Sequence, residues 1–187
     1  MIDVSICGHK MDSLDIFCWS KNIDNAFWEK YYLLLLLYPD YVRPYVSCVT
    51  KALKDNGHNI FIISARKNAD LPKIEKRTMY NITHEYLINN NIYYNELILE
   101  ENKWNVIDMC HINMMIEDNP LFFMHHTKNP TIPLLCFDTP YNQDVCGTNI
   151  SRVYSWHDIL IKTKKIQEDF YEYQKTSEKC CSNLRPR

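Results

Sequence analysis

The stretch Met114-Met-Ile-Glu-Asp-Asn-Pro120 decides how the rest of the chain is interpreted. Its three apolar residues are followed at once by two adjacent carboxylates, Glu117 and Asp118, and then by Asn-Pro. A buried strand that ends in two carboxylates can hold a hard metal ion, because ligands in open α/β sheets bind beyond the carboxyl ends of the strands. The same residues also fit a simpler interpretation, in which an acidic turn follows a strand.

Short apolar runs alternate with helical patterns along the chain. We expect strands at residues 1–7, 59–65, 94–99, 113–117, 133–137 and 152–154, and helices at 21–38, 45–56, 74–90, 103–111 and 157–175. This alternation predicts an α/β fold with a doubly wound, mostly parallel sheet, and the strand at 59–65 is expected to be buried. We expect one domain over residues 1–175 and a polar tail at 176–187.

Polar residues follow the ends of several of these expected strands. Right-handed crossovers place the carboxyl ends of parallel strands at one edge of a sheet. Asp3, Ser64, Glu117, Asp118 and Asp138 all lie at or just beyond such ends. Their shared placement predicts a single site at that edge.

Composition limits the classes of function. The 187 residues are 46% apolar, enough for a sizeable core, and the formal net charge of -2 indicates neither a nucleic acid polymer nor an anionic membrane as partner. With 3 glycines, the chain cannot build a Gly-rich phosphate loop. A homodimer is left open.

The cysteines and the first residues of the chain indicate the cellular compartment in which the protein is expected. The 8 cysteines show neither a CxxC pair nor zinc spacing, and Cys180-Cys181 is expected to be exposed in the polar tail. The first residues do not resemble a signal peptide, and the run Leu33 to Leu37 is too short to span a bilayer. We therefore expect a reduced, cytoplasmic protein.

Three parts of the chain resemble the haloacid dehalogenase-like (HAD) phosphohydrolases, in particular the small cytosolic 5'-nucleotidase or 5'(3')-deoxyribonucleotidase branch. They are Gly57-His-Asn-Ile-Phe-Ile-Ile-Ser-Ala-Arg66, the stretch at 114–120, and the closing Phe137-Asp-Thr-Pro-Tyr-Asn142 with Arg152-Val-Tyr-Ser-Trp156. The resemblance covers residues 1–160. It implies a HAD-like α/β domain with a small helical cap inserted at about residues 9–42, which would shield the site from water.

The resemblance implies a Mg²⁺-dependent phosphohydrolase that acts on a small phosphorylated substrate, such as a nucleoside 5'-monophosphate, through an aspartyl-phosphate. Asp3 would be the nucleophile and a metal ligand, and the backbone carbonyl of Ser5 would be a second ligand. Glu117 or Asp118 would complete the metal site, because Mg²⁺ needs only one or two carboxylates.

The substrate-binding residues implied by the resemblance lie after the second and third strands. Ser64 would donate a hydrogen bond to a phosphate oxygen, with Ala65 and Arg66 in the same loop. Lys103 would pair with the phosphate and with Asp3.

The chain departs from the family in its first motif. The family has Asp-x-Asp-Gly-Thr, whereas this chain has Asp3-Val-Ser-Ile-Cys7. The second Asp normally acts as general acid and base, and the loss of such a group costs about 10²–10⁴-fold in rate. Ser5 therefore keeps open an alternative, a catalytically impaired HAD-like protein that binds a ligand or a partner. A third interpretation is an unrelated α/β binding domain in which Glu117 and Asp118 only cap a strand.

Each candidate residue also has an ordinary structural interpretation. Asp3 fits an N-terminal surface acid, Ser64 a turn cap, and Lys103 a solvated helix residue. Arg66 fits a surface role equally well, and Asp138 fits a turn former before Thr-Pro.

Two further groups of residues attract a functional interpretation that we do not favour. His125-His126 is adjacent in sequence, and such a pair on a loop does not converge on one ion. Trp19, Phe27, Trp28 and Tyr31 in the expected cap could stack on a base, but helix packing explains aromatic residues at this spacing more simply.

Overall fold

The computed structural model describes residues 20–23, 25–27, 30–31, 42–66, 78–124 and 132–182, with side chains up to residue 175. Several predicted features lie outside these residues: the strand at 1–7 with Asp3 and Ser5, Trp19 and Trp28, the run Leu33 to Leu37, His125-His126, and the side chains of Cys180-Cys181. Of the expected cap, residues 21–23, 25–27 and 30–31 are helical. The rings of Phe27 and Tyr31 lie 5.1 Å apart between centroids, as expected for residues one helical turn apart.

Helices and strands alternate in the described chain, as the sequence predicts. The elements are α3 (Val46–Asp55), β1 (Phe61–Ser64), α4 (Met79–Asn89), β2 (Glu96–Leu99), α5 (Lys103–Met109), β3 (Met115–Glu117), α6 (Pro120–Met124), β4 (Leu134–Phe137), β5 (Ile150–Val153) and α7 (Trp156–Ser182). Helix α7 continues past residue 175, where we expected the polar tail to begin. None of the helices in the described residues is both long and apolar enough to cross a membrane.

Helix α6 lies where no helix is expected from the sequence. The side-chain oxygen of Asn119 accepts a hydrogen bond from the backbone N–H of Leu121 at 3.0 Å, and Pro120 takes the first helical position. An Asn cap followed by Pro is a helix start signal, so Asn-Pro both ends the preceding strand and begins this helix.

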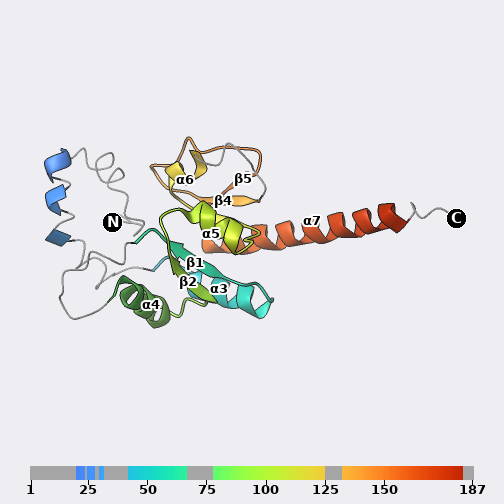
Figure 1. Cartoon of the computed structure of the whole chain (residues 1–187), viewed down its shortest axis with the longest axis horizontal. Helices are drawn as coiled ribbons and strands as arrows, with labels where there is room; N and C mark the ends of the chain where they lie inside the picture. The colour runs from blue at the N-terminus through green and yellow to red at the C-terminus, as the bar shows by residue number, and fades with distance from the viewer. Residues whose placement is uncertain are drawn as a thin grey trace.

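The strands are parallel, as predicted, and they form two sheets in the described part of the chain (Figure 1). β1 pairs with β2, while β3, β4 and β5 pair in sequence order. β4 is buried along its whole length, which suits the middle strand of a parallel sheet. The residues of β1 are half-buried, so the expectation that the strand at 59–65 is buried is wrong.

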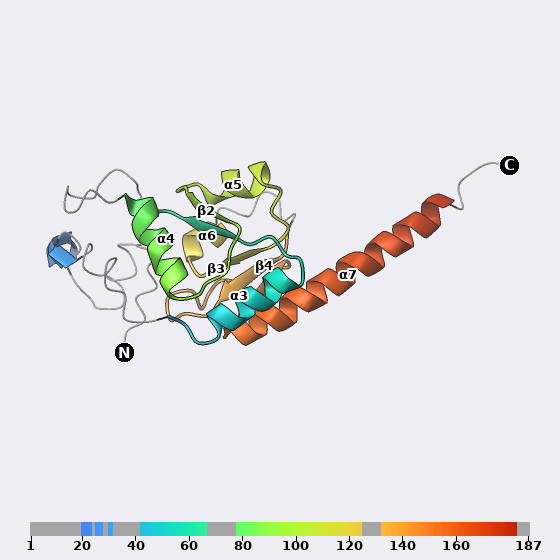
Figure 2. The same ribbon diagram turned by 90° about the horizontal axis from the view of Figure 1, so that it is seen from below.

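Helices cover both faces of the three-stranded sheet (Figure 2). Side chains alternate along a strand, so Leu134 and Cys136 of β4 point to one face and Leu135 and Phe137 to the other. The first face packs with residues of α5 and α6, and the second packs with α7, where Ile159 is fully buried. This two-sided packing is the doubly wound arrangement that the sequence predicts.

The two sheets lie next to each other. Ile63 of β1 packs against the same apolar cluster as Met115 of β3. At the carboxyl ends, Lys103 follows β2 at the start of α5 and contacts Glu117, the last residue of β3. The carboxyl ends of the two sheets therefore lie on the same side of the molecule.

Three helices end in the same way before the next strand begins. In α3, α4 and α5, the residue two positions after the helix has a left-handed backbone; the three residues are Gly57 (φ 83°), Asn91 (φ 51°) and His111 (φ 51°). Each turn is closed by two backbone hydrogen bonds in the Schellman pattern: Gly57 to Lys54 and His58 to Leu53, Asn91 to Ile88 and Ile92 to Leu87, His111 to Asp108 and Ile112 to Ile107. These turns end each helix and lead the chain toward the amino end of the next strand.

Candidate active site

A buried ion pair joins α5 to the end of β3. Lys103 and Glu117 expose 7% and 5% of their surface, and the ammonium of Lys103 donates a hydrogen bond to Oε2 of Glu117. The other carboxylate oxygen, Oε1, accepts hydrogen bonds from the backbone N–H groups of Asp118 at 3.0 Å and Asn119 at 3.1 Å. Both oxygens of Glu117 are therefore engaged within the protein.

Burial dominates the electrostatics of this pair. It raises the pKa of Glu117 above the ordinary range, because the charged form loses its hydration, while the charge and hydrogen bond of Lys103 act in the opposite direction. The interpretation of Lys103 as a solvated helix residue is wrong, since its side chain is almost completely covered. Buried ion pairs are costly to desolvate, so one at a strand end points to a role other than simple stability.

Asp118 faces the loop between β4 and β5. The hydroxyl of Tyr141 donates to its Oδ2 at 2.7 Å. The side-chain amide of Asn142 donates to its backbone carbonyl oxygen at 2.8 Å. Asp118 is half-buried at the edge of the sheet, held through both its side chain and its backbone.

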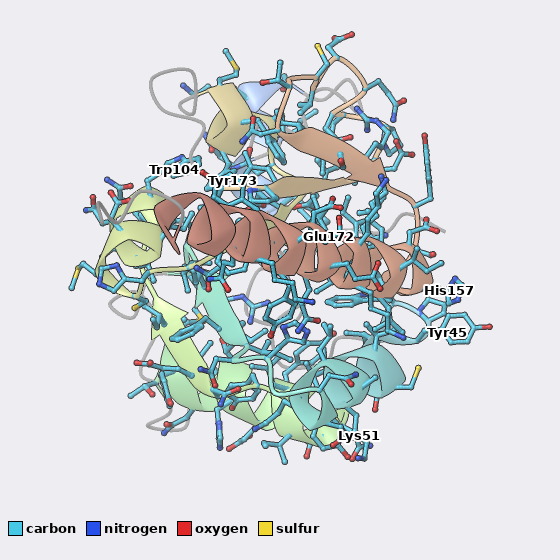
Figure 3. The ribbon with its side chains drawn as sticks, turned by 90° about the vertical axis from the view of Figure 1, so that its right-hand side faces the viewer. Tyr45, Lys51, Trp104, His157, Glu172 and Tyr173 are labelled. Atoms are coloured by element: carbon cyan, nitrogen blue, oxygen red, sulfur yellow. The ribbon has the colours of Figure 1, made fainter. Side chains whose placement is uncertain are left out.

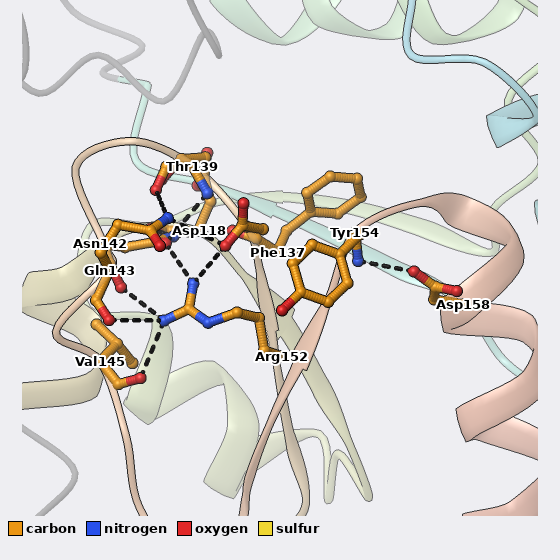
Figure 4. Close-up of polar contacts among 10 residues, drawn as sticks. Asp118, Phe137, Thr139, Asn142, Gln143, Val145, Arg152, Tyr154 and Asp158 are labelled. Atoms are coloured by element: carbon orange, nitrogen blue, oxygen red, sulfur yellow. Dashed lines mark hydrogen bonds and ion pairs between the residues drawn. The ribbon is translucent and has the colours of Figure 1, made fainter.

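The guanidinium of Arg152 organises that loop (Figure 4). Nη2 donates to three backbone carbonyls, those of Asn142 at 2.9 Å, Gln143 at 3.2 Å and Val145 at 3.1 Å. Nη1 donates to Oδ1 of Asp138 at 2.8 Å and to Oδ1 of Asn142 at 2.9 Å. Asp138 therefore pairs with Arg152 and helps to fix the turn after β4.

The residues at the end of β1 make contacts within their own loop and with α4. Oγ of Ser64 accepts a hydrogen bond from the backbone N–H of Arg66 at 3.4 Å, which fits the turn-cap interpretation. The guanidinium of Arg66 donates to Oγ1 of Thr83 on α4 at 3.0 Å. Ser64, Ala65 and Arg66 are all half-buried, and their roles in phosphate binding stay predictions.

Several residues of this edge were not assigned from the sequence. Tyr141, Asn142 and Arg152 lie in the closing segments that carry the family resemblance, but the sequence gives them no role. The guanidinium of Arg43 lies 4.1 Å from the ring centroid of Phe137, the last residue of β4. The sequence signal was the turn-forming run Thr139-Pro-Tyr-Asn142, but the burial of Asn142, which requires partners for its amide, is visible only in the structure.

The described residues supply part of the expected metal ligands. A carboxylate at the strand edge offers the oxygen ligand that Mg²⁺ requires, and Asp118 provides one. In residues 42–66, 78–124 and 132–175 no three His, Cys, Asp or Glu side chains converge as a metal site. The donor type therefore fits Mg²⁺, with the remaining ligands expected from Asp3 and Ser5.

Comparisons with known proteins add one relative. Over 103 residues the chain is 31% identical to the Bacillus subtilis (strain 168) protein named "Putative nucleotidase YqfW", a match that covers 49% of this chain and 53% of that protein. The chain thus matches about half the length of this relative. No family model matches the chain, and no solved structure gives a significant match.

Proposed function

We propose that this chain is a Mg²⁺-dependent phosphohydrolase that removes phosphate from a small phosphomonoester, with nucleoside 5'-monophosphates as the first substrates to test. The observation that carries the proposal is the buried pair of Lys103 and Glu117 beside Asp118, at the carboxyl edge of parallel strands. The relative from Bacillus subtilis, named as a nucleotidase, supports the same class of reaction.

Lys103 would attract and orient the phosphate. A phosphate monoester is a dianion, and the ammonium of Lys103, held by Glu117, would donate a charge-assisted hydrogen bond to one of its oxygens. Glu117 gives one oxygen to Lys103 and the other to two backbone N–H groups. We therefore assign Glu117 to the positioning of Lys103 and Asp118 to the metal.

Bound Mg²⁺ would neutralise the phosphate and hold it for attack. Asp118 would be its ligand from β3, while Asp3 and the backbone carbonyl of Ser5 are the ligands implied by the family resemblance.

The reaction would take place in two displacements. A carboxylate oxygen of Asp3 attacks phosphorus, and the bond from phosphorus to the ester oxygen breaks, leaving an aspartyl-phosphate and an alcohol. Water then attacks the same phosphorus, which restores the carboxylate of Asp3 and releases inorganic phosphate. The leaving alcohol needs a proton in the first step, and the serine at position 5 is a poor donor of it.

That serine supports the second candidate function, a catalytically impaired protein of the same fold that binds a phosphorylated ligand or a partner. A general acid contributes about 10²–10⁴-fold to a rate. Ser5→Asp should therefore raise phosphate release by about that factor if residues 1–7 form the expected strand, and an unchanged rate would argue against this placement of the motif.

The decisive experiment measures phosphate release from a panel of nucleoside monophosphates and p-nitrophenyl phosphate, with and without Mg²⁺. Asp118→Asn and Asp3→Asn should each abolish a Mg²⁺-dependent release. Asp108→Asn is the matched control, because this carboxylate is exposed on α5. Release equal in all variants would come from a contaminant and would refute the proposal, and no release from any of them would favour the binding function.

A further inference from the structure

The side chain of Arg152 holds the loop that follows β4 to the neighbouring strand. Arg152 lies on β5, and its guanidinium reaches three backbone carbonyls of residues 142–145. Backbone carbonyls bound in this way cannot shift without losing charge-assisted hydrogen bonds, which are about twice as strong as neutral ones. The course of the loop is therefore fixed by β5.

Asn142 connects this loop to both strand ends. Its amide nitrogen donates to the carbonyl oxygens of Asp118 and Phe137, each at 2.8 Å. Its amide oxygen accepts from the backbone N–H of Thr139 at 3.1 Å and from Arg152 at 2.9 Å. These four bonds use the two donors and two lone pairs of the amide, so the buried side chain has one orientation.

Tyr141 precedes Asn142, so its backbone is fixed by the same contacts. Its hydroxyl donates to Oδ2 of Asp118 at 2.7 Å. This bond links the loop to the carboxylate itself, whereas Asn142 links it only to the Asp118 backbone.

We propose that Tyr141 is a positioning residue for Asp118, and that Asn142 and Arg152 hold Tyr141 in place. The inference rests on the proposed function in one respect, the assignment of Asp118 as a metal ligand. Ligating carboxylates depend on hydrogen bonds from residues around them, and the loss of such a bond typically costs about 10–100-fold in metal affinity. Tyr141 would act by restricting Asp118 to the orientation that binds Mg²⁺.

The test uses the full chain and the variant Tyr141→Phe, which removes only the hydroxyl. We expect about 10–100-fold weaker Mg²⁺ binding by calorimetry, with a nearly unchanged melting temperature. Tyr154→Phe is the matched control, because Tyr154 lies just after β5 and is 68% exposed (Figure 4). In activity assays, the Mg²⁺ concentration for half-maximal rate should rise, while KM for the substrate at saturating Mg²⁺ should not.

Each outcome separates this inference from the proposed function. Tyr141→Phe that binds Mg²⁺ as tightly as the unchanged chain would overturn the inference and leave the phosphohydrolase proposal intact. Equal weakening in Tyr141→Phe and Tyr154→Phe would also overturn it. If the unchanged chain does not bind Mg²⁺, the metal role of Asp118 fails and the inference fails with it. If the chain binds Mg²⁺ without releasing phosphate, only the proposed activity fails, and the affinity of Tyr141→Phe still decides the inference.

Discussion

Lys103 and Glu117 show how burial changes the role that a residue can have. Lysine and glutamate are almost never fully buried without a partner. Here each is the other's partner, and two backbone N–H groups complete the acceptors of Glu117. Removal of one member leaves an uncompensated charge in the interior, whereas removal of both does not.

Lys103→Met should destabilise the fold by about 3–5 kcal/mol, because it leaves the carboxylate of Glu117 buried without its cation. Glu117→Gln keeps an acceptor for the backbone N–H groups but leaves the ammonium of Lys103 buried without its carboxylate. The double variant should lose much less free energy of unfolding than the sum of the two single changes. Urea denaturation of the four proteins measures this coupling, and additive losses would contradict the described pair.

Cys136 is the other buried group whose chemistry is set by its surroundings. Burial raises the pKa of its thiol to about 11, an effect that the nearby charge of Arg152 only partly offsets. Below pH 9.0, the ordinary thiol pKa, the thiol is neutral and its contribution to stability is fully present. That contribution would be lost as the pH rises through the higher pKa of the folded state, because the unfolded chain then releases the proton more readily.

We expect Cys136 to resist alkylation by iodoacetamide at pH 8, because only about a thousandth of it is thiolate there. The exposed Cys48 and Cys146 serve as internal controls and should react first. Mass spectrometry of the labelled peptides distinguishes the sites. Labelling of Cys136 at the same rate would mean that β4 is accessible to solvent.

The candidate site could be predicted in part from sequence. Glu117 and Asp118 stand out because a strand that ends in two carboxylates is a local pattern. The pairing of Lys103 with Glu117 depends on side-chain direction and burial, which the pattern does not contain. Tyr141 reaches Asp118 from a loop far along the chain, and only the folded arrangement of β3, β4 and β5 brings them together.

At the scale of elements, the turns after α3, α4 and α5 determine where the following strands begin. A left-handed residue at this position suits glycine, and α3 has Gly57 there. Asn91 and His111 have the same conformation after α4 and α5, and both residue types adopt it more readily than most side chains do, though at a steric cost that glycine does not have. Of the three helix ends, the one at Gly57 therefore has the residue best suited to this conformation.

His111→Gly should stabilise the protein by about 0.5–1 kcal/mol, because glycine adopts the left-handed conformation without steric cost. Gly57→Ala is the reverse change and should destabilise by about 1 kcal/mol or more. A Cβ at Gly57 would meet no atom within 4 Å, so the loss would come from the backbone alone. Thermal unfolding of both variants checks the pair, and a gain from Gly57→Ala would contradict the turn geometry.

Most elements were predictable because hydrophobic periodicity is a local signal. The differences concern boundaries and short elements, which local signals define poorly. β5 begins at Ile150, before its expected start at Arg152, and α6 is too short to show a helical period. The arrangement of strands in two sheets depends on pairing between distant segments and could not be read from any one of them.

At the scale of the whole molecule, α7 has two different parts. Its first part packs through Ile159, Thr163 and Ile166 against the three-stranded sheet, and the helix also contacts α3 (Figure 3). Every described side chain from Glu168 to Lys175 is exposed, and the helix extends beyond the rest of the fold (Figures 1 and 2). A surface helix without apolar packing adds little to the stability of a single chain.

Removal of residues 168–187 should therefore change the free energy of unfolding by only about 0.5 kcal/mol, the usual size of surface effects. Ile159→Ala, in the packed part of the same helix, should cost about 2–5 kcal/mol. Chemical denaturation at two protein concentrations measures both, with light scattering to report the molecular mass. The exposed part carries Phe170 and Tyr173 on the stripe that continues from Ile159 and Ile166. The homodimer left open from the sequence is untested, and the same experiment bears on it. A truncation as costly as Ile159→Ala, with a loss that grows with protein concentration, would show that a second copy covers this stripe, because only an associated state becomes more stable with concentration.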